Sequence, residues 1–263
     1  MDLGLKDRVA LVCGASRGLG KAVALSLARE GARLAICSRN LENIQQAAEE
    51  IRGETGTEVI ALPVDLSSPE EARRFFREAH RHYGQVDILV NNAGGPPSLP
   101  FLEISEEHWQ AAFQLTLMSA VTLIKEAIPV MQARKFGRII NLTSVAVKQP
   151  ILGLILSNAL RTGLVGLSKT LATIYAPDNV LINNVCPGYT LTERVRELSE
   201  VIARRQHATP EAVIKGWEAE IPMGRLGKPE ELADLVVFLA SERAGYLTGT
   251  TIQVDGGYYR GLM

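Results

Sequence analysis

The chain has 263 residues, of which 46% are apolar and 22% are charged, and its formal net charge is −1. A chain of this size can bury a full core, and α/β proteins of this length are often one domain, so we predict a single domain over residues 1–263. The near-neutral charge leaves no broad basic face for nucleic-acid phosphates or anionic lipid, so neither nucleic acid nor membrane is an expected partner.

Apolar, β-rich runs alternate with amphipathic helical stretches along the whole chain, a pattern typical of a parallel sheet covered by helices on both faces. Two helix starts carry proline and acidic residues in the first turn, at Ser68-Pro69 and at Lys228-Pro229. The predicted strands are residues 8–13, 33–37, 58–62, 87–91, 138–143, 180–185 and 251–254. The sequence therefore predicts an α/β fold with a doubly wound (Rossmann) parallel sheet of seven strands.

A glycine-rich loop follows the first predicted strand and leads directly into a helix. It reads Gly14-Ala15-Ser16-Arg17-Gly18-Leu19-Gly20. Glycines let the backbone turn tightly and approach a pyrophosphate, whose charge is stabilised by the N–H groups at the helix N-terminus. The spacing GxxxGxG differs from the common GxGxxG, but its place between a strand and a helix supports a dinucleotide-binding loop.

The second predicted strand ends in Ser38-Arg39, where a protein that binds NAD normally offers an acidic residue to the ribose hydroxyls. A carboxylate would repel a ribose phosphate, whereas Arg39, helped by Arg17, can pair with it. The sequence therefore favours NADP over NAD. The other interpretation is that both arginines are solvated surface charges.

The regular alternation breaks at residues 190–222, which are charged and only weakly periodic. An insertion after the carboxyl end of a strand commonly covers the ligand crevice of a parallel sheet. Val213, Ile214 and Trp217 indicate a packed lid rather than a disordered segment, and they equally suit an apolar ligand or the lid's own packing.

Further motifs follow the glycine-rich loop, which we call the phosphate loop. They are Asp65 after the third strand, Asn91-Asn92-Ala93-Gly94 after the fourth, Pro187-Gly188 after the sixth, and the C-terminal segment 247–257. With these motifs the chain resembles the short-chain dehydrogenase/reductase family, and within it the 3-oxoacyl-(acyl carrier protein) reductase group. This resemblance implies a cofactor site formed by these motif residues: Gly14, Ser16, Arg17, Gly18, Leu19, Gly20, Ser38, Arg39, Asp65, Leu66, Asn92, Ala93, Gly94, Pro187, Gly188, Thr190 and Thr192.

The same resemblance implies an active site of a serine, a tyrosine and a lysine, supported by an asparagine. Ser144 occupies the serine place, and thirteen residues later, where tyrosine belongs, stands Ser157. Arg161 takes the lysine place and Thr116 the asparagine place. Serine is a much weaker acid than a phenol and reaches less far, so Ser157 cannot inherit proton donation. Arginine keeps a positive charge, so Arg161 can still hold ribose hydroxyls or stabilise an alkoxide.

Two other residues are candidates for the proton donor. Lys148 lies four residues beyond Ser144, and a lysine desolvated there could act as the acid; the alternative is an exposed loop lysine. Tyr189 follows Pro187-Gly188 and could supply a phenol from the opposite wall, or simply shape the pocket. Both interpretations stay open for each residue.

The remaining signals indicate no metal and no export. The first eight residues lack the charged start and apolar middle of a signal peptide, and apolar runs such as residues 235–240 are too short to span a bilayer. No histidine has ligand spacing. Cys13, Cys37 and Cys186 share no CxxC spacing and are interpreted as free structural thiols. These observations predict a cytoplasmic protein.

Two functions follow from these observations. The first is an NADP-dependent oxidoreductase with an atypical active site, acting on a small carbonyl or alcohol such as a 3-oxoacyl thioester, with Ser144, Ser157, Arg161 and Lys148 as its catalytic candidates. The second is an NADP-binding protein that has lost catalysis and serves as a cofactor sensor or an assembly partner. The family resemblance further implies a homotetramer, with a dimer as the alternative.

Overall fold

The computed structural model describes residues 1–262 and confirms the predicted sheet. Its seven strands are all parallel and lie in the order β3-β2-β1-β4-β5-β6-β7. The strands are β1 (Val9–Val12), β2 (Arg33–Ser38), β3 (Val59–Pro63), β4 (Ile88–Asn91), β5 (Gly137–Leu142), β6 (Val180–Pro187) and β7 (Thr251–Val254). The order reverses between β1 and β4, which is where a doubly wound sheet binds its ligand.

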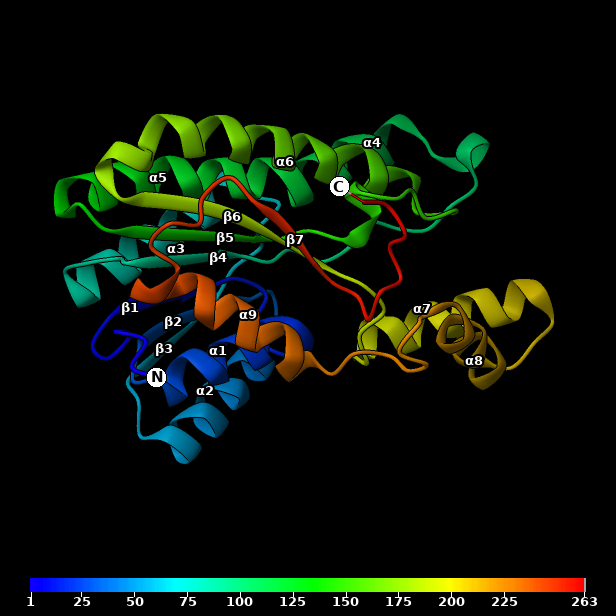
Figure 1. Ribbon diagram of the computed structural model, residues 1–263, viewed down its shortest axis with the longest axis horizontal. Coiled ribbons are helices and arrows are strands. Elements are labelled where there is room, and N and C mark those ends of the chain that lie inside the picture. The colour runs from blue at the N-terminus through cyan, green and yellow to red at the C-terminus, as the bar shows by residue number, and fades with distance from the viewer. Residues whose placement is uncertain (263) are drawn as a thin grey trace.

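Helices cover both faces of this sheet because its strands are apolar on both sides. Along β1, Ala10 and Val12 join one buried cluster, whereas Val9 and Leu11 join the other. The first cluster lies under α1 (Gly18–Arg29), α2 (Leu41–Thr55) and α9 (Pro229–Ala240). The second lies under α3 (Pro69–Tyr83), α5 (Ser119–Arg134) and α6 (Ile155–Tyr175), on the opposite side of the sheet (Figure 1).

Shorter elements complete the chain. A π-helical segment, η2 (Gln114–Met118), joins α4 (Glu106–Phe113) to α5. The remaining short helices are η1 (Phe101–Glu103), η3 (Val145–Val147), η4 (Ala176–Asp178) and η5 (Glu242–Ala244). The two predicted helix starts are confirmed: Ser68 caps α3 by accepting a hydrogen bond from the N–H of Glu71, and α9 begins at Pro229.

The continuous helical stretch Glu106–Arg134 qualifies the expectation that no segment could span a bilayer. By length and composition alone it could, with a mean hydropathy of 1.3 in its most apolar window. Half of that window is buried, and α5 contributes Leu123, Ile124 and Met131 to the core beneath the sheet. A core helix of a globular protein has the same properties, and the packing of α5 against α3 and β5 accounts for its apolar character.

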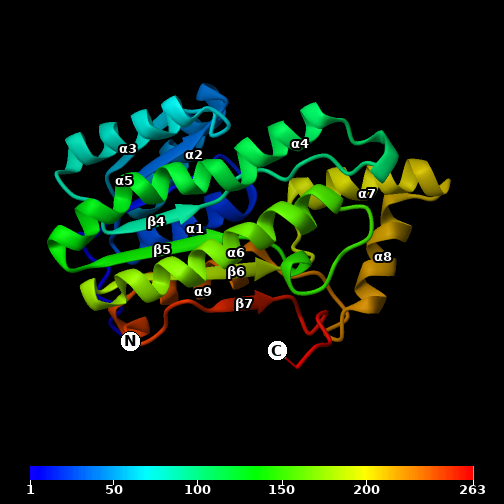
Figure 2. The same cartoon turned by 90° about the horizontal axis from the view of Figure 1, so that it is seen from above.

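The segment predicted to be a lid folds into α7 (Glu193–Gln206) and α8 (Pro210–Glu220). Both helices lie beyond the carboxyl ends of the strands, apart from the two helical layers (Figure 2). Val213 and Trp217 are each 8% exposed and form a small core with Ile221 and Leu226. These apolar side chains therefore serve the lid's own packing.

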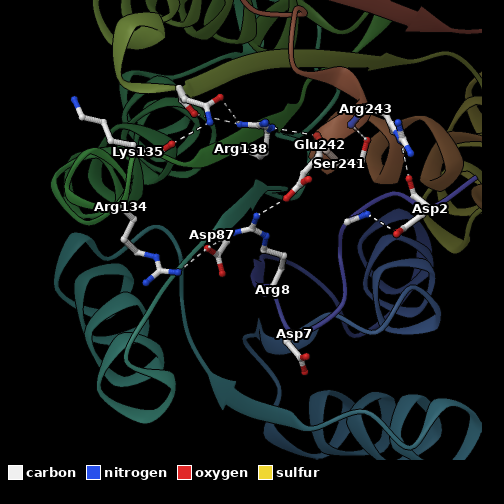
Figure 3. A network of polar contacts seen from close by, with 12 residues as sticks. Asp2, Asp7, Arg8, Asp87, Arg134, Lys135, Arg138, Ser241, Glu242 and Arg243 are labelled. Carbon is white, nitrogen blue, oxygen red and sulfur yellow. Dashed lines mark hydrogen bonds and ion pairs between the residues drawn. The ribbon is translucent and has the colours of Figure 1, made fainter.

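A buried carboxylate organises the opposite, amino-terminal edge of the sheet (Figure 3). Asp87 is fully buried and accepts hydrogen bonds from the N–H of Val9 at 2.9 Å and from Gln85 Nε2 at 2.9 Å. Arg8 and Arg134 approach it at 3.4 and 3.6 Å. Because these groups come from the starts of β1 and β4 and the end of α5, Asp87 ties together elements that are distant in sequence.

Candidate active site

A cavity of about 600 Å³ opens at the carboxyl ends of the strands, between the sheet and the lid. One end is lined by the phosphate loop and the residues after β2 and β3, and the other by Ser144, Ser157 and Arg161. A single cavity therefore brings together the predicted cofactor and catalytic residues. Every predicted cofactor residue lines it except Gly20, the last residue of the loop, which packs against the backbone of Gly14.

The phosphate loop has the geometry needed to receive an anion. Gly18 has a φ of +58°, and a Cβ on Gly20 would lie 2.2 Å from the carbonyl oxygen of Gly14, so a larger residue fits at neither position. Asn92 Nδ2 donates to the carbonyl oxygens of Cys13 and Gly14, each at 3.2 Å. No side chain caps the N-terminus of α1. Its N–H groups therefore point toward the cavity with no capping partner, as a bound pyrophosphate requires.

The residues after β2 and β3 form the other side of the cofactor end. Ser38, Arg39 and Asp65 all line the cavity, and Arg39 is exposed. Asp65 Oδ1 accepts hydrogen bonds from the N–H and the hydroxyl of Ser67, which fixes the carboxylate. Asn40, which caps α2, also lines this end and was not predicted from the sequence; its position directly after Arg39 was the available signal.

A row of amide side chains crosses the sheet beneath the cavity. Asn91, Asn141 and Asn184 are paired in register on β4, β5 and β6. Asn91 Nδ2 donates to Asn141 Oδ1 at 2.8 Å, and Asn141 Nδ2 donates to Asn184 Oδ1 at 3.1 Å. Asn141 Nδ2 also donates to Ser168 Oγ at 2.9 Å. This buried network anchors α6 to the sheet and so positions Ser157 and Arg161 on the same helix.

The two serines reach the cavity from different elements. Ser144 follows β5 and begins η3, where its hydroxyl accepts a hydrogen bond from the N–H of Ala146 at 3.1 Å. Ser157 lies in the first turn of α6 and is 7% exposed. The start of α6 is fixed by Asn158, whose Nδ2 donates to the carbonyl oxygen of Ile151 at 3.0 Å. The backbone segments that carry the two hydroxyls are therefore held in place.

Arg161 lies one turn after Ser157 on the same face of α6 and is 8% exposed. Its Nη1 donates to the carbonyl oxygen of Leu142 at 3.0 Å, and its Nη2 lies 3.4 Å from the carbonyl oxygens of Ala93 and Gly94. Burial lowers the pKa of the guanidinium to about 10, so it stays charged at neutral pH. Within residues 1–262 no carboxylate lies within ion-pair distance of it.

Thr116, in the predicted asparagine place, does not reach the main cavity. It lies in the π-helical segment η2, and its hydroxyl donates to the carbonyl oxygen of Ala112 at 2.7 Å. Single-turn π-helices interrupt the regular helical ladder and often mark functional positions. Here the side chain of Thr116 is satisfied by its own helix.

The structure places the two candidate proton donors differently. Lys148 is absent from the cavity lining, and its Nζ lies 5.5 Å from the ring centroid of Tyr259. Tyr189 lines the cavity, but its ring stacks on Trp217 with centroids 4.6 Å apart and meets Tyr258 edge-on. Burial raises the pKa of the Tyr189 phenol above its ordinary value. Tyr189 is thus a packed residue in the wall of the cavity. The role of Lys148 as the proton donor stays a prediction.

The sequence reasoning missed Arg194, which lines the cavity from the first turn of α7. Its Nη2 donates to the carbonyl oxygen of Pro96 at 3.3 Å. The residue lies two positions after the predicted Thr192, so proximity to that motif was the signal that could have found it.

The cysteines and histidines lie outside this site. Cys13, Cys37 and Cys186 are buried and free. No group of three or more metal-ligating side chains occurs in the part of the chain that the structure describes. His108 instead serves in the cap of α4, where its Nδ1 accepts from the N–H of Ser105 at 3.1 Å.

Comparison with known proteins decides the family. A family model described as enoyl-(acyl carrier protein) reductase matches residues 14–259. The 3-oxoacyl-[acyl-carrier-protein] reductase FabG of Aquifex aeolicus is 34% identical over 259 residues, covering 98% of this chain and all of that protein. The chain belongs to the short-chain dehydrogenase/reductase family. The predicted resemblance, including its 3-oxoacyl-(acyl carrier protein) reductase-like members, is therefore confirmed.

Other members of the short-chain dehydrogenase/reductase family match equally completely. The NADPH-dependent reductase BacG of Bacillus subtilis is 33% identical, covering 98% of this chain and all of that protein. The crystal structure of L-sorbose reductase from Gluconobacter frateurii, complexed with NADPH and L-sorbose, superposes with a TM-score of 0.95 at 34% identity over the full length of both chains. The 3-oxoacyl-[acyl-carrier-protein] reductase and the L-sorbose reductase are named for different substrates, so the family alone does not fix the substrate.

Proposed function

We propose that this chain is an NADP-dependent oxidoreductase that transfers hydride between NADP(H) and a carbonyl or alcohol, with an atypical active site. The observation that carries the proposal is the single cavity, which joins an uncapped phosphate loop to Ser144, Ser157 and Arg161. A 3-oxoacyl thioester is one candidate substrate, because 3-oxoacyl-[acyl-carrier-protein] reductases are among the relatives.

Arg39 and Arg17 support NADP as the cofactor. Both line the phosphate end of the cavity, and Arg39 is exposed, which suits a guanidinium that receives a ribose phosphate. Arg17 pairs with Glu197 of α7 at 3.1 Å, so it links the phosphate loop to the lid. The NADPH bound in L-sorbose reductase and the NADPH dependence of the reductase BacG support the same choice.

The active-site residues divide the remaining work. A bound NADPH supplies the hydride. The hydroxyl of Ser144 donates a hydrogen bond that orients the carbonyl oxygen, and Ser157 offers a second hydroxyl beside it. Arg161 holds a fixed positive charge in a buried setting, where it stabilises the negative charge that develops on that oxygen. Neither serine is acidic enough to give up a proton. We therefore propose that water donates the proton that converts the alkoxide into the alcohol.

The proposal identifies Ser157 and Arg161 with the family's tyrosine and lysine places. It is supported by the spacing from Ser144 and by the position of both residues on the cavity face of α6. Lys148 could replace water as the acid only if its side chain left the ring of Tyr259 and turned inward. Mutating Lys148 to Met separates these routes, because turnover that depends on water survives the change.

The direct test of this function is NADPH oxidation by the purified chain with and without Ser144→Ala. We expect that change to lower turnover at least 100-fold, since loss of one donor to a developing oxyanion costs ~3 kcal/mol. NADPH binding, followed by its fluorescence, should not change. Full activity in Ser144→Ala would contradict the assignment.

The second candidate is an NADP-binding protein without catalysis. It is favoured by one observation: Tyr189 is the only tyrosine among the described residues that line the cavity, and it is already packed between Trp217 and Tyr258. This candidate predicts tight NADPH binding with no turnover on any carbonyl substrate, whereas robust wild-type turnover would exclude it.

We also propose a homotetramer, which the family resemblance implies. The outward face of α6 carries small exposed residues, including Ala159, Gly163 and Gly166, which would allow a second helix to approach closely. Light scattering on the purified chain should give four times the monomer mass of 28.6 kDa, and a dimer mass would restrict assembly to one interface.

A further inference from the structure

Two guanidinium groups flank the segment that follows β4. Arg161 reaches it from α6 and lies 3.4 Å from the carbonyl oxygen of Gly94. Arg194 reaches it from α7 and donates to the carbonyl oxygen of Pro96 at 3.3 Å. Both side chains line the same cavity. The cavity is therefore bordered by two positive charges that share a three-residue segment.

Few acidic groups balance these charges. Asp65 and Glu193 are the acidic residues among the described residues that line the cavity. Asp65 is bound to Ser67 at the cofactor end, and Glu193 Oε2 lies beside the phosphate loop, 3.8 Å from where a Cβ of Gly18 would be. Neither therefore neutralises Arg161.

Arg194 has only a partial partner. Its Nη1 lies 3.8 Å from Glu197, which pairs more closely with Arg17 at 3.1 Å. Arg161 has carbonyl oxygens as its only hydrogen-bond partners in the described chain. Arg161 is buried, so it carries an uncompensated desolvation cost that negative charge on a ligand relieves. The side chain of Arg194 is 52% exposed, so it is open to pairing with an anionic group of a ligand in the cavity.

We propose that the substrate is a 3-oxo acid, whose carboxylate is separated from the reacting carbonyl by one carbon. Arg194 pairs with the carboxylate, while Arg161 and Ser144 face the carbonyl oxygen. This inference rests on the proposed function and narrows its substrate class, because esters and thioesters are neutral where a 3-oxo acid carries its carboxylate. Guanidinium and carboxylate groups match as a planar pair of donors and acceptors, which gives selectivity for the acid.

The same helix offers a matched control. Arg205 also lies on α7 and donates to a backbone carbonyl of the neighbouring loop, that of Ser98, at 3.0 Å. It does not line the cavity. Changing Arg205 to Gln therefore removes a similar contact between the lid and this loop without removing a charge from the cavity.

The experiment compares acetoacetate with methyl acetoacetate on the full-length chain. Binding of each is measured by calorimetry on the protein saturated with NADP⁺, which cannot reduce the ketone. The value of kcat/KM is measured with NADPH wherever turnover occurs, and NADPH affinity is measured separately by fluorescence. We expect the wild type to prefer the acid at least 10-fold. Arg194→Gln should remove this preference by weakening the acid alone, Arg194→Lys should restore part of it, and Arg205→Gln should leave it intact.

Three results would overturn the inference. The first is equal handling of acid and ester by the wild type. The second is an equal loss for acid and ester in Arg194→Gln, which would assign Arg194 to holding the loop. The third is a loss of NADPH affinity in Arg194→Gln with the acid preference retained, which would assign Arg194 to the cofactor's phosphates. Failure of the wild type to bind NADPH would instead refute the proposed function, and calorimetry on the chain alone would still decide the acid preference.

Discussion

Arg161 Nη1 donates a hydrogen bond of 3.0 Å to the carbonyl oxygen of Leu142, the last residue of β5. Ser144 follows two residues later, so the guanidinium and the serine hydroxyl are fixed at the same strand end. The fork of an arginine can hold this carbonyl and still direct other N–H groups into the cavity, whereas a lysine presents a single ammonium. Arg161 thus connects α6 to the sheet and also supplies the buried positive charge of the site.

Replacing Arg161 by Gln tests its charge. We expect kcat/KM to fall at least 30-fold, because a preorganised charge at a developing oxyanion contributes ~2–4 kcal/mol. Since burial lowers its pKa only to about 10, the charge is constant between pH 6 and 9. The ratio of wild-type to variant kcat/KM should therefore not change across this range. A ratio that collapses toward one within it would show that another, titrating group supplies the effect.

Arg39 should govern the choice between cofactors. Changing Arg39 to Glu places a carboxylate at the end of β2, which repels a ribose phosphate and accepts hydrogen bonds from ribose hydroxyls. We expect the ratio of NADPH to NADH affinity to fall at least 10-fold. Arg73→Gln, at a half-exposed position of α3 outside the cavity, is the control. An unchanged ratio in Arg39→Glu would support the interpretation of Arg39 as a surface charge.

The buried Asp87 is a separate test of the fold (Figure 3). Asp87→Ala leaves the N–H of Val9 without its side-chain acceptor and leaves Arg8 and Arg134 without this carboxylate. We expect the free energy of unfolding to fall by ~3 kcal/mol, as measured by chemical denaturation. Arg243→Ala removes an exposed contact to the carbonyl oxygen of Asp2 and should change it by less than ~1 kcal/mol. Equal effects would contradict the central role given to Asp87.

The sheet was predictable from the sequence because buried parallel strands are continuous apolar runs, and each predicted strand lies within two residues of the observed one. The cofactor end was also predictable, because the strand ends place its motifs at one edge of the sheet. Arg194 could not be predicted as a cavity residue, because the charged run around it has weak periodicity and does not indicate which side chains point toward the cavity. The position of Lys148 depends on Tyr259 near the C-terminus, a contact between residues far apart in sequence that no local pattern encodes.

The length of the helical stretch Glu106–Arg134 was likewise not predictable from single apolar runs. Each apolar run is short, whereas α4, η2 and α5 form one continuous helix.

The most direct measurement is NADPH oxidation by the wild type and by the double variant Ser157→Tyr, Arg161→Lys, against a panel of ketones, oxo acids and 3-oxoacyl thioesters. We expect measurable wild-type turnover that depends on Ser144 and Arg161. We also expect a different substrate or pH profile in the double variant, because a phenol then supplies the proton. NADPH binding by both proteins with turnover by the double variant alone would contradict it, and would show that the natural chain binds the cofactor without using it for this chemistry.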